Sequence, residues 1–365
     1  MSIRQKLSVV ASALKYLAKV SDYSPYRFLI AANRYAYLYR KRRFSPVEIE
    51  MFNEADPNIH PDHIHSVYSN EEHLDLQKIL NPIDAAKWVE NKEIFYRKCL
   101  EHNLPHPTVH AVLDRVGLKR LTSRENNSEM HLLDELKDGE YIFKPTHGVH
   151  GEGVVACEKR GGLFYLRGQH QLPPDRIFQH LRSTFGYQSY LLQSRIRNHL
   201  EIREFSGSPT LQTARINTIA YGEDDIDVVY ASFRMTTGDG VSDNFNFGTT
   251  GNSLWPVNVT SGKISKMYCL SPIGYGLQAV EPGDHRYPGD SSLTLPFWRQ
   301  SKELVKRAAK HFYPLVTVGW DVAITDEGPK LIEANAYWDH ANGMEEYRDS
   351  GLYQTLTAMV ADRSS

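Results

Sequence analysis

The alternation of apolar and polar side chains is clearest near the C-terminus, where two short runs flank an Asp-Glu-Gly-Pro turn at 326–329. Runs with a period of two on either side of such a turn predict a β-hairpin. If the turn is centred on Glu327, Asp321 lies opposite Glu333, and Asn335 shares the face of Glu333. The opposite face is predicted to be apolar and buried, and it carries Trp320, Val322, Ile324 and Ile332.

Similar patterns predict the other elements. Residues 1 to about 80 have a helical pattern, with an irregular polar stretch at 53–70. Asn81 is predicted to cap a helix that starts after it, and further helices are predicted at 91–102 and 296–312. Strand-like runs occupy 108–113, 140–145, 153–157, 190–193, 212–221, 226–234, 255–259, 316–324 and 330–334. Helices mixed with antiparallel hairpins predict an α+β fold.

The polar face of the C-terminal hairpin is a candidate metal site. Two carboxylates and an amide above an apolar layer are costly unless a cation neutralises them. Ligands that are all oxygen suit Mg²⁺ or Mn²⁺, which commonly also binds substrate phosphates. Asp321, Glu333 and Asn335 are therefore the predicted ligands. The alternative is a solvated hairpin face with two incidental acids.

A second candidate is a glycine-rich loop that follows a predicted strand at 140–145. The strand contains Lys144, and the loop has glycines at 148, 151 and 153. Glycines let backbone N–H groups approach an anion, and a nearby lysine can add a point charge. The loop lacks the Gly-Lys-Ser/Thr of a P-loop. An ordinary hairpin turn is the alternative.

Together these features resemble the ATP-grasp superfamily, which has a lysine at a helix start, a strand lysine before a glycine loop, a hinge strand and a final acidic hairpin. Asn91-Lys92-Glu93, followed by Leu104-Pro105-His106-Pro107, resembles the first motif, with asparagine in place of aspartate. Leu191–Ile196 resembles the hinge, with Gln193 in place of the usual glutamate. The position that often carries an arginine before the metal aspartate is Gly319 here.

Within the superfamily, the chain is similar to the sugar-transfer-associated group. The stretches that carry this resemblance are Thr213–Thr218, Phe233–Met235, Ser242–Asn244, Val318–Thr325 and Gly328–Asn335. The resemblance implies an ATP-grasp fold in which two α+β subdomains clamp ATP, with ATP and Mg²⁺ (or Mn²⁺) as cofactors. The implied nucleotide-binding residues are Lys92, Lys144, Gly148, Gly151, Gly153, Gln193, Ser194 and Ile196.

The same resemblance divides the chain into three parts. Residues 1–84 form a mainly helical N-terminal region, 85–190 the small or lid subdomain, and 191–365 the large subdomain with the metal hairpin. A nucleotide-binding fold of this type is expected to be an enzyme.

The implied activity is ATP-dependent ligation of a carboxylate to an amine through an acyl phosphate, with a cell-surface sugar or peptide precursor as one expected context. Arg215 and Arg234 lie on neighbouring predicted strands and are candidates to stabilise the acyl phosphate, with surface ion pairing as the alternative. Asp339 or His340 could accept the amine proton, although a capped turn explains them as well. A kinase on the same scaffold and a non-catalytic nucleotide-binding protein are the competing functions.

Composition narrows the partners. The 365 residues have a formal net charge of −2, which indicates no nucleic-acid partner. Three widely spaced cysteines fit a reducing cytoplasm, and no apolar run is long enough to cross a bilayer. Residues 1–43, however, contain ten Lys and Arg against one acid, Asp22. A basic amphipathic helix there could contact an anionic membrane surface, or could simply dock on the body. The oligomeric state is not indicated.

Overall fold

The computed structural model describes most of the chain. The described residues are 3–115, 117–121, 131–148, 153–166, 171–236, 243–245, 250–264, 266–284, 286–288, 292–341 and 343–364. Gly151, one of the predicted nucleotide-binding residues, lies outside them. Within the described part, no helix combines the length and apolar character that a bilayer span requires.

The N-terminal region is helical, as predicted. Its helices are α1 (Ile3–Val20), α2 (Pro25–Lys41), α3 (Pro46–Met51), α4 (His63–Ser66), α5 (Asn70–Leu80), α6 (Ile83–Glu90) and α7 (Lys92–Glu101). Ser45 and Ser69 start α3 and α5 with capping boxes, in which a serine and the glutamate three residues later satisfy each other's backbone N–H. Asn91 caps α7 by accepting from the amides of Glu93 and Ile94.

Asn81, by contrast, is not a helix cap. Its buried side chain accepts from the amides of Val316 and Thr317 and donates to the carbonyls of Thr317 and Ala336. Pro82 occupies the cap position of α6 instead. The predicted helix start was right to within a residue or two, but the asparagine joins the helical region to the C-terminal hairpin.

The first of two large sheets contains β1 (Val109–Leu113), β2 (Leu118–Lys119), β3 (Gly139–Pro145), β4 (Val155–Arg160), β5 (Leu163–Leu166), β6 (Gln171–Leu172) and β7 (Tyr190–Ser194). The strand order is β2-β1-β7-β3-β4-β5-β6, and the pairings are antiparallel. Helices α8 (Leu132–Glu135) and α9 (Pro174–Phe185) supply apolar side chains to its core. Because β7 begins at Tyr190 and pairs within this sheet, the predicted boundary at 190/191 falls at the start of one of its strands.

The second large sheet has the order β13-β12-β10-β9-β8-β15-β16. Its strands are β8 (Thr213–Ala220), β9 (Ile226–Met235), β10 (Ser253–Pro256), β12 (Met267–Leu270), β13 (Leu277–Val280), β15 (Thr317–Thr325) and β16 (Gly328–Asn335). A small separate sheet pairs β11 (Lys263–Ile264) with β14 (Leu293–Thr294). The remaining helices are α10 (Leu200–Ser206), α11 (Trp298–His311), α12 (Glu345–Arg348) and α13 (Leu352–Ser364). This mixture of helices and antiparallel sheets confirms the α+β prediction.

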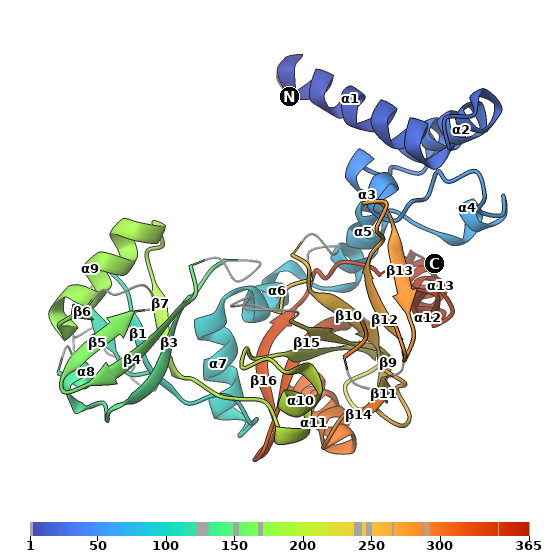
Figure 1. The fold of residues 1–365 in the computed structure, drawn as a ribbon. Helices are drawn as coiled ribbons and strands as arrows, with labels where there is room; N and C mark the ends of the chain where they lie inside the picture. The colour runs from blue at the N-terminus through green and yellow to red at the C-terminus, as the bar shows by residue number, and fades with distance from the viewer. Residues whose placement is uncertain are drawn as a thin grey trace.

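One face of the second sheet is covered by α11. Leu304, Ala308 and Phe312 belong to the core that contains Trp320, and the Phe312 and Trp320 rings lie 5.5 Å apart. The two large sheets form separate lobes with α7 between them, and α1 and α2 lie at the far end of the molecule (Figure 1). The other face of the second sheet is therefore the one that can hold a ligand.

The C-terminal hairpin has the predicted pairing of Asp321 with Glu333, but its turn is shorter than predicted. Thr325 pairs with Gly328, so the turn contains two residues rather than a centre on Glu327. A bulge at Ile332 then restores the pairing, because Val322 lies opposite Leu331 while Asp321 lies opposite Glu333. The bulge also corrects the prediction that Ile332 is on the buried face, since Ile332 lines a cavity on the polar side.

Candidate nucleotide and metal site

A cavity of about 530 Å³ lies between the two large sheets. The first sheet contributes side chains from β3 and β7, and the second contributes the polar side chains of β8, β9, β15 and β16. The polar and charged lining residues include Lys144, Gln193, Ser194, Thr213, Arg215, Asn217, Ser232, Arg234, Asp243, Asp321, Glu333, Asn335, Asp339 and His340. The structure thus gathers predicted site residues from segments that are far apart in the sequence.

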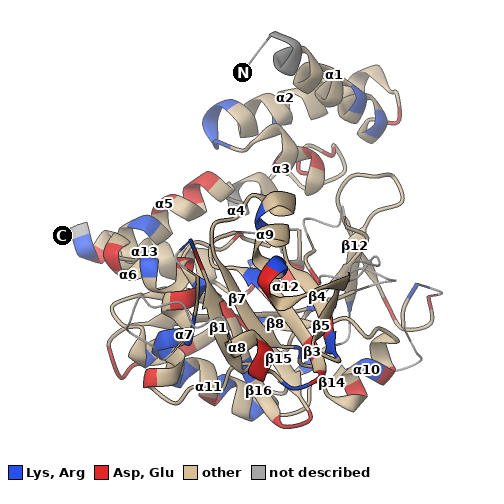
Figure 2. Cartoon of the chain, turned by 90° about the vertical axis from the view of Figure 1, so that its left-hand side faces the viewer, with Lys and Arg blue, Asp and Glu red and all other residues tan. Residues whose placement is uncertain are grey.

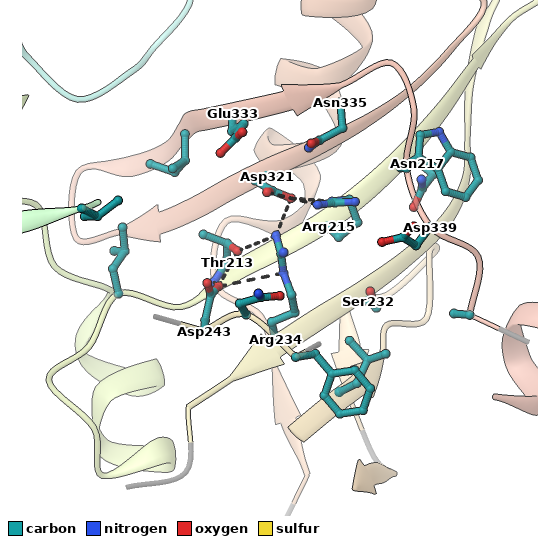
Figure 3. A pocket seen from close by; sticks show the side chains of 18 of the residues that line it. Thr213, Arg215, Asn217, Ser232, Arg234, Asp243, Asp321, Glu333, Asn335 and Asp339 are labelled. Atoms are coloured by element: carbon teal, nitrogen blue, oxygen red, sulfur yellow. Dashed lines mark hydrogen bonds and ion pairs between the residues drawn. The ribbon is translucent and has the colours of Figure 1, made fainter. Parts of the chain in front are cut away.

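Asp321 is held by two arginines from neighbouring strands. Arg215 makes a bidentate contact, with Nε 2.5 Å from Oδ1 and Nη2 3.2 Å from Oδ2, and Arg234 Nη2 contacts Oδ1 as well (Figure 3). The strand register explains this, because Asp321 pairs directly with Arg215 across β15 and β8. Burial raises the pKa of Asp321, but the two guanidinium groups outweigh it and hold that pKa well below its usual range.

Asp243 adds a further carboxylate beside Arg234. Its Oδ2 accepts a 2.8 Å hydrogen bond from the Thr213 amide and lies 4.0 Å from Arg234 Nε. Burial raises the pKa of Asp243 above its ordinary value, although Arg234 and the Thr213 hydrogen bonds oppose this. Arg234 therefore bridges Asp321 and Asp243, which fixes its guanidinium within the cavity wall.

Glu333 faces two lysines, Lys92 at the start of α7 and Lys144 on β3 of the first sheet. Lys92 Nζ lies 3.0 Å from Oε1 and Lys144 Nζ lies 3.7 Å from Oε2. Lys92 also donates to the carbonyl of Gly148 at 2.8 Å, and Lys144 donates to the carbonyl of Ile332 at 3.2 Å. Burial lowers the pKa of Lys92 below its ordinary value, and the attraction of Glu333 opposes that shift. The two predicted phosphate-binding lysines thus converge on one predicted metal ligand.

These contacts correct the idea that the hairpin carboxylates lack charge partners. Arginines compensate Asp321 and lysines compensate Glu333, so the described cluster is neutralised by side chains. Four cationic groups, Lys92, Lys144, Arg215 and Arg234, surround three carboxylates, Asp243, Asp321 and Glu333. With Asp339, which also lines the cavity, cations and carboxylates are equal in number, and the cations are grouped around Asp321 and Glu333, where they could contact a phosphate chain.

The donor set also fits a hard cation. Asp321, Glu333 and Asn335 all line the cavity from the two strands of one hairpin, and Asn335 Nδ2 donates to the Gly319 carbonyl at 3.3 Å. That bond orients the amide. Among the described residues, no group of three His, Cys, Asp or Glu side chains has metal-site geometry. A site here would thus combine two carboxylates with an amide oxygen, which suits Mg²⁺ or Mn²⁺.

The ends of the glycine loop pack on one aromatic ring. A Cβ on Gly148 would lie 3.4 Å from Tyr187, and a Cβ on Gly153 would lie 2.5 Å from Tyr187 and 2.9 Å from Pro145. Gly153 also has a φ of +72°, which disfavours other residues. Both positions therefore favour glycine, Gly148 through its φ of +151° and Gly153 through its contacts and its φ, and both lie next to the strand that carries Lys144.

The predicted hinge lies on the first-sheet side of the cavity. Gln193, Ser194 and Ile196 line it, and Ser194 Oγ lies 2.8 Å from His110 Nε2. Gln193 is almost fully buried, and its side chain hydrogen-bonds with Tyr96.

Asp339 and His340 follow the hairpin and line the cavity, but their surroundings differ. Asp339 is exposed and accepts a 3.2 Å hydrogen bond from Asn70. His340 is 4% exposed, and its Nε2 lies 3.3 Å from Glu48 Oε1. The structure therefore makes Asp339 the more accessible of the two predicted proton acceptors.

The sugar-transfer-associated ATP-grasp family model matches residues 71–360. The chain belongs to this family. Among solved structures, similarity is found to a biotin carboxylase from Campylobacter jejuni, with a TM-score of 0.42 and 10% identity over 74% of this chain and 47% of that chain. A D-alanine–D-alanine ligase from Coxiella burnetii has a TM-score of 0.41 and 11% identity over 80% of this chain and 66% of that chain. A D-alanine–D-alanine ligase from Bacillus anthracis complexed with ATP has a TM-score of 0.39 and 11% identity over 77% of this chain and 66% of that chain.

The chain spans less than half of the length of the first three solved structures, with 47%, 43% and 46% covered. A comparison with curated proteins finds no match. The ATP-grasp family membership predicted from the sequence is confirmed by the family match.

Sequence reasoning missed part of the cavity wall in this ATP-grasp chain. Thr213, Arg215 and Asn217 alternate with apolar Ala214 and Ile216 along β8, so they share one face of the strand. The same alternation in the sequence would have predicted that Asn217 lies on the same face as Arg215. The contact of Asp243 with Thr213 spans 30 residues and had no comparable local signal.

Proposed function

We propose that this chain is an ATP-dependent carboxylate–amine ligase that forms an amide through an acyl phosphate. The observation that carries the proposal is the joint lining of one cavity by a phosphate-binding lysine, two arginines and three oxygen ligands: Lys144, Arg215, Arg234, Asp321, Glu333 and Asn335. Membership of the ATP-grasp family supports nucleotide binding at this place.

In the first step, a carboxylate oxygen of the acid attacks the γ-phosphorus of ATP, and the bond from that phosphorus to ADP breaks. Lys92 and Lys144 hold the phosphates from the side of Glu333, and in-line positioning supplies much of the catalysis. Mg²⁺ on Asp321, Glu333 and Asn335 would neutralise the charge that develops on the phosphoryl oxygens.

In the second step, the amine attacks the acyl carbon, the bond from that carbon to the phosphate oxygen breaks, and the amine loses a proton. Asp339 is the proposed proton acceptor, because it is exposed at the cavity. His340 instead holds its loop in place through Glu48.

The family description adds a context to this proposal. We propose that the acid or the amine is a precursor of a cell-surface sugar or peptide. A cytoplasmic location is part of the proposal, because the three cysteines, Cys99, Cys157 and Cys269, are all free thiols that suit a reducing compartment.

ADP release tests the proposal when it is measured over a matrix of small acids and amines with Mg²⁺ and ATP. A ligase releases ADP only when an acid and an amine are both present, and it forms an amide. Glu333→Gln should abolish the release, whereas Glu327→Gln, at the exposed turn of the same hairpin, should not change it. A stable phosphorylated hydroxyl product would instead identify a kinase, and nucleotide binding without turnover would identify a non-catalytic binding protein.

A further inference from the structure

Two N–H donors beside Arg215 have no hydrogen-bond partner among the described residues. They are Asn217 Nδ2 and Trp338 Nε1, and both atoms are buried. Both residues line the cavity, with only 1% and 3% of their surfaces exposed. Buried polar groups in native proteins are nearly always paired, so two unpaired donors in one cavity wall point to a ligand.

Asn217 Nδ2 and the ring of Trp338 both pack against Gly319. A Cβ on Gly319 would lie 3.3 Å from Asn217 Nδ2, 3.2 Å from Trp338 Cγ and 3.1 Å from Arg215 Cδ. The absence of a side chain on Gly319 therefore lets Arg215, Asn217 and Trp338 pack closely at this point of the cavity wall. Figure 3 shows Asn217 next to Arg215 and Asp339, beyond the metal-ligand face of the hairpin.

The arginines are less available than these donors. Arg215 and Arg234 both contact Asp321, and Arg234 also donates to Thr213 at 3.1 Å. A substrate oxygen that needed their guanidinium groups would compete with a buried carboxylate. Unpaired N–H groups can donate to the same oxygen without breaking an existing contact.

We propose that Asn217 and Trp338 bind the acyl oxygen of the acid substrate, which rests on the ligase function proposed above. One carboxylate oxygen attacks the phosphorus, and the other accepts from Asn217 Nδ2 and Trp338 Nε1. When the amine attacks the acyl carbon, the C=O electron pair moves onto that second oxygen and returns as phosphate leaves. Donors at this position stabilise the charge that develops there.

Indole N–H signals in a ¹H–¹⁵N spectrum test this directly, with formate and acetate as probes in the presence of MgADP. The signal of Trp338 is identified by its loss in Trp338→Phe. Trp255, Trp298 and Trp320 serve as internal references, because each already donates from Nε1 within the protein. We expect the Trp338 proton to move downfield with either probe while the three references stay in place.

A stability comparison separates this role from a structural one. Because the Trp338 N–H is unpaired, Trp338→Phe should lower the Tm less than Trp320→Phe, whose lost N–H is bonded to Thr218 at 2.8 Å. Asn217→Leu should leave the Tm and the Kd for MgADP unchanged and reduce kcat/KM for the acid by about 100-fold.

Loss of MgADP binding by the wild type would count against the proposed function itself. MgADP binding with a stationary Trp338 signal for both probes would overturn the acyl-oxygen subsite alone. An equal Tm loss in the two tryptophan variants would also overturn it, since Trp338 would then have a protein partner.

A second inference comes from the N-terminal helices and is independent of the catalytic site. Leu7, Val10 and Leu14 follow one face of α1 and are each more than half exposed, as are Tyr26 and Leu29 on α2. The spacings of three and four residues make Leu7, Val10 and Leu14 an apolar stripe on α1, and the spacing of three puts Tyr26 and Leu29 on one face as a shorter stripe on α2. These two stripes form the exposed apolar surface of α1 and α2.

Charge indicates what this surface meets. Ten basic side chains against one acid give residues 1–43 a formal charge of +9, although Arg34, Arg42 and Arg43 bind to the rest of the protein. Figure 2 shows blue positions on α1 and α2, which lie away from the two sheets. Lys15, Arg40 and Lys41 are exposed there. We propose that this surface docks on an anionic lipid bilayer, with the apolar stripes at the acyl boundary and the basic groups near headgroups.

Flotation with vesicles of phosphatidylglycerol and phosphatidylcholine, compared with phosphatidylcholine alone, tests the docking. Binding should require the anionic lipid, weaken with salt, and fall at least tenfold in the double variant Leu7→Gln, Leu14→Gln. Ile83→Gln, which changes an even more exposed apolar residue on α6, should bind normally. Absence of binding to anionic vesicles would refute the proposal, as would a dimer in sedimentation that the double variant abolishes.

Discussion

The buried carboxylate of Asp321 forms ion pairs with two guanidinium groups, and these ion pairs determine how a substitution there changes stability. Removing the charge of Asp321 leaves Arg215 and Arg234 with less compensation in a buried wall. The side chain of Glu333 is 26% exposed. It forms ion pairs with two lysines, whose long side chains are flexible. The two predicted metal ligands therefore differ in their structural role.

We expect Glu333→Gln and Asp321→Asn both to abolish ADP release but to differ in stability. Asp321→Asn should lower the free energy of unfolding by about 3 kcal/mol, because it breaks a buried ion pair on one side. Glu333→Gln should cost less, about 1 to 2 kcal/mol, because Glu333 is itself 26% exposed even though Lys92 and Lys144 are buried. Denaturant unfolding of both variants, alongside the activity assay, checks this. Full activity in either variant would remove that residue from the metal site.

Sequence reasoning identified these residues but not their ion pairs. The triad Asp321, Glu333 and Asn335 could be predicted because side chains alternate between the two faces of the hairpin. Its pairing with Arg215 and Lys92 spans 106 and 241 residues, and only the packing of strands and lobes brings such groups together. The residues could thus be predicted from the sequence, and their electrostatic state could not.

Among the elements, the C-terminal hairpin has the predicted pairing of Asp321 with Glu333 but reaches it through a different turn. A turn centred on Glu327 gave Asp321 opposite Glu333, whereas the protein uses a two-residue turn and a bulge at Ile332. The shorter turn shifts the strand pairing by one residue, and the bulge shifts it back by one residue. Bulges depend on packing against neighbouring strands, so alternation alone could not reveal this one.

The glycine loop provides a test at the scale of elements. Gly153→Ala should lower the free energy of unfolding by about 3 kcal/mol, because it combines a positive φ with a Cβ 2.5 Å from Tyr187. Gly161→Ala is the matched control, since its φ is also positive but nothing lies within 4 Å, and about 1 kcal/mol is expected. Equal losses in chemical denaturation would show that the Tyr187 contact has no effect.

The junction between the helical region and the hairpin depends on Asn81. Asn81→Ala leaves buried backbone groups of Val316, Thr317 and Ala336 without partners, so we expect a loss of about 3 kcal/mol in unfolding free energy. Asn70→Ala, which removes one exposed hydrogen bond to Asp339, should change it by less than about 1 kcal/mol. A neutral Asn81→Ala would contradict the assigned role.

For the whole molecule, the N-terminal helices hold the loop that follows the hairpin. Glu48 pairs with His340, and Gln77 donates to the carbonyl of Trp338 and accepts from its amide. These contacts join segments more than 250 residues apart, which is why the sequence showed a helical region without showing its purpose. The region positions one wall of the cavity.

Glu48 gives this coupling a pH dependence. Burial raises its pKa, but hydrogen bonds from His340, the Asn70 amide and Ser45 outweigh burial and lower it below the ordinary value. A carboxyl whose folded pKa is lowered stabilises the fold above its unfolded pKa, and the contribution is lost as pH falls through the folded pKa. Glu48→Gln should therefore cost about 2 kcal/mol near pH 7 and progressively less in acid. Denaturant unfolding over that range checks this, and a pH-independent difference would contradict it.

The central claim is that nucleotide phosphates and Mg²⁺ bind where Lys144 meets Glu333. Calorimetric titration with the magnesium complex of a non-hydrolysable ATP analogue measures this directly. We predict binding by the wild type, at least tenfold weaker binding by Lys144→Ala, and unchanged binding by Lys330→Ala, which removes a lysine of the same hairpin that pairs with Glu327 at its turn. Equal affinities for the wild type and Lys144→Ala would contradict the account.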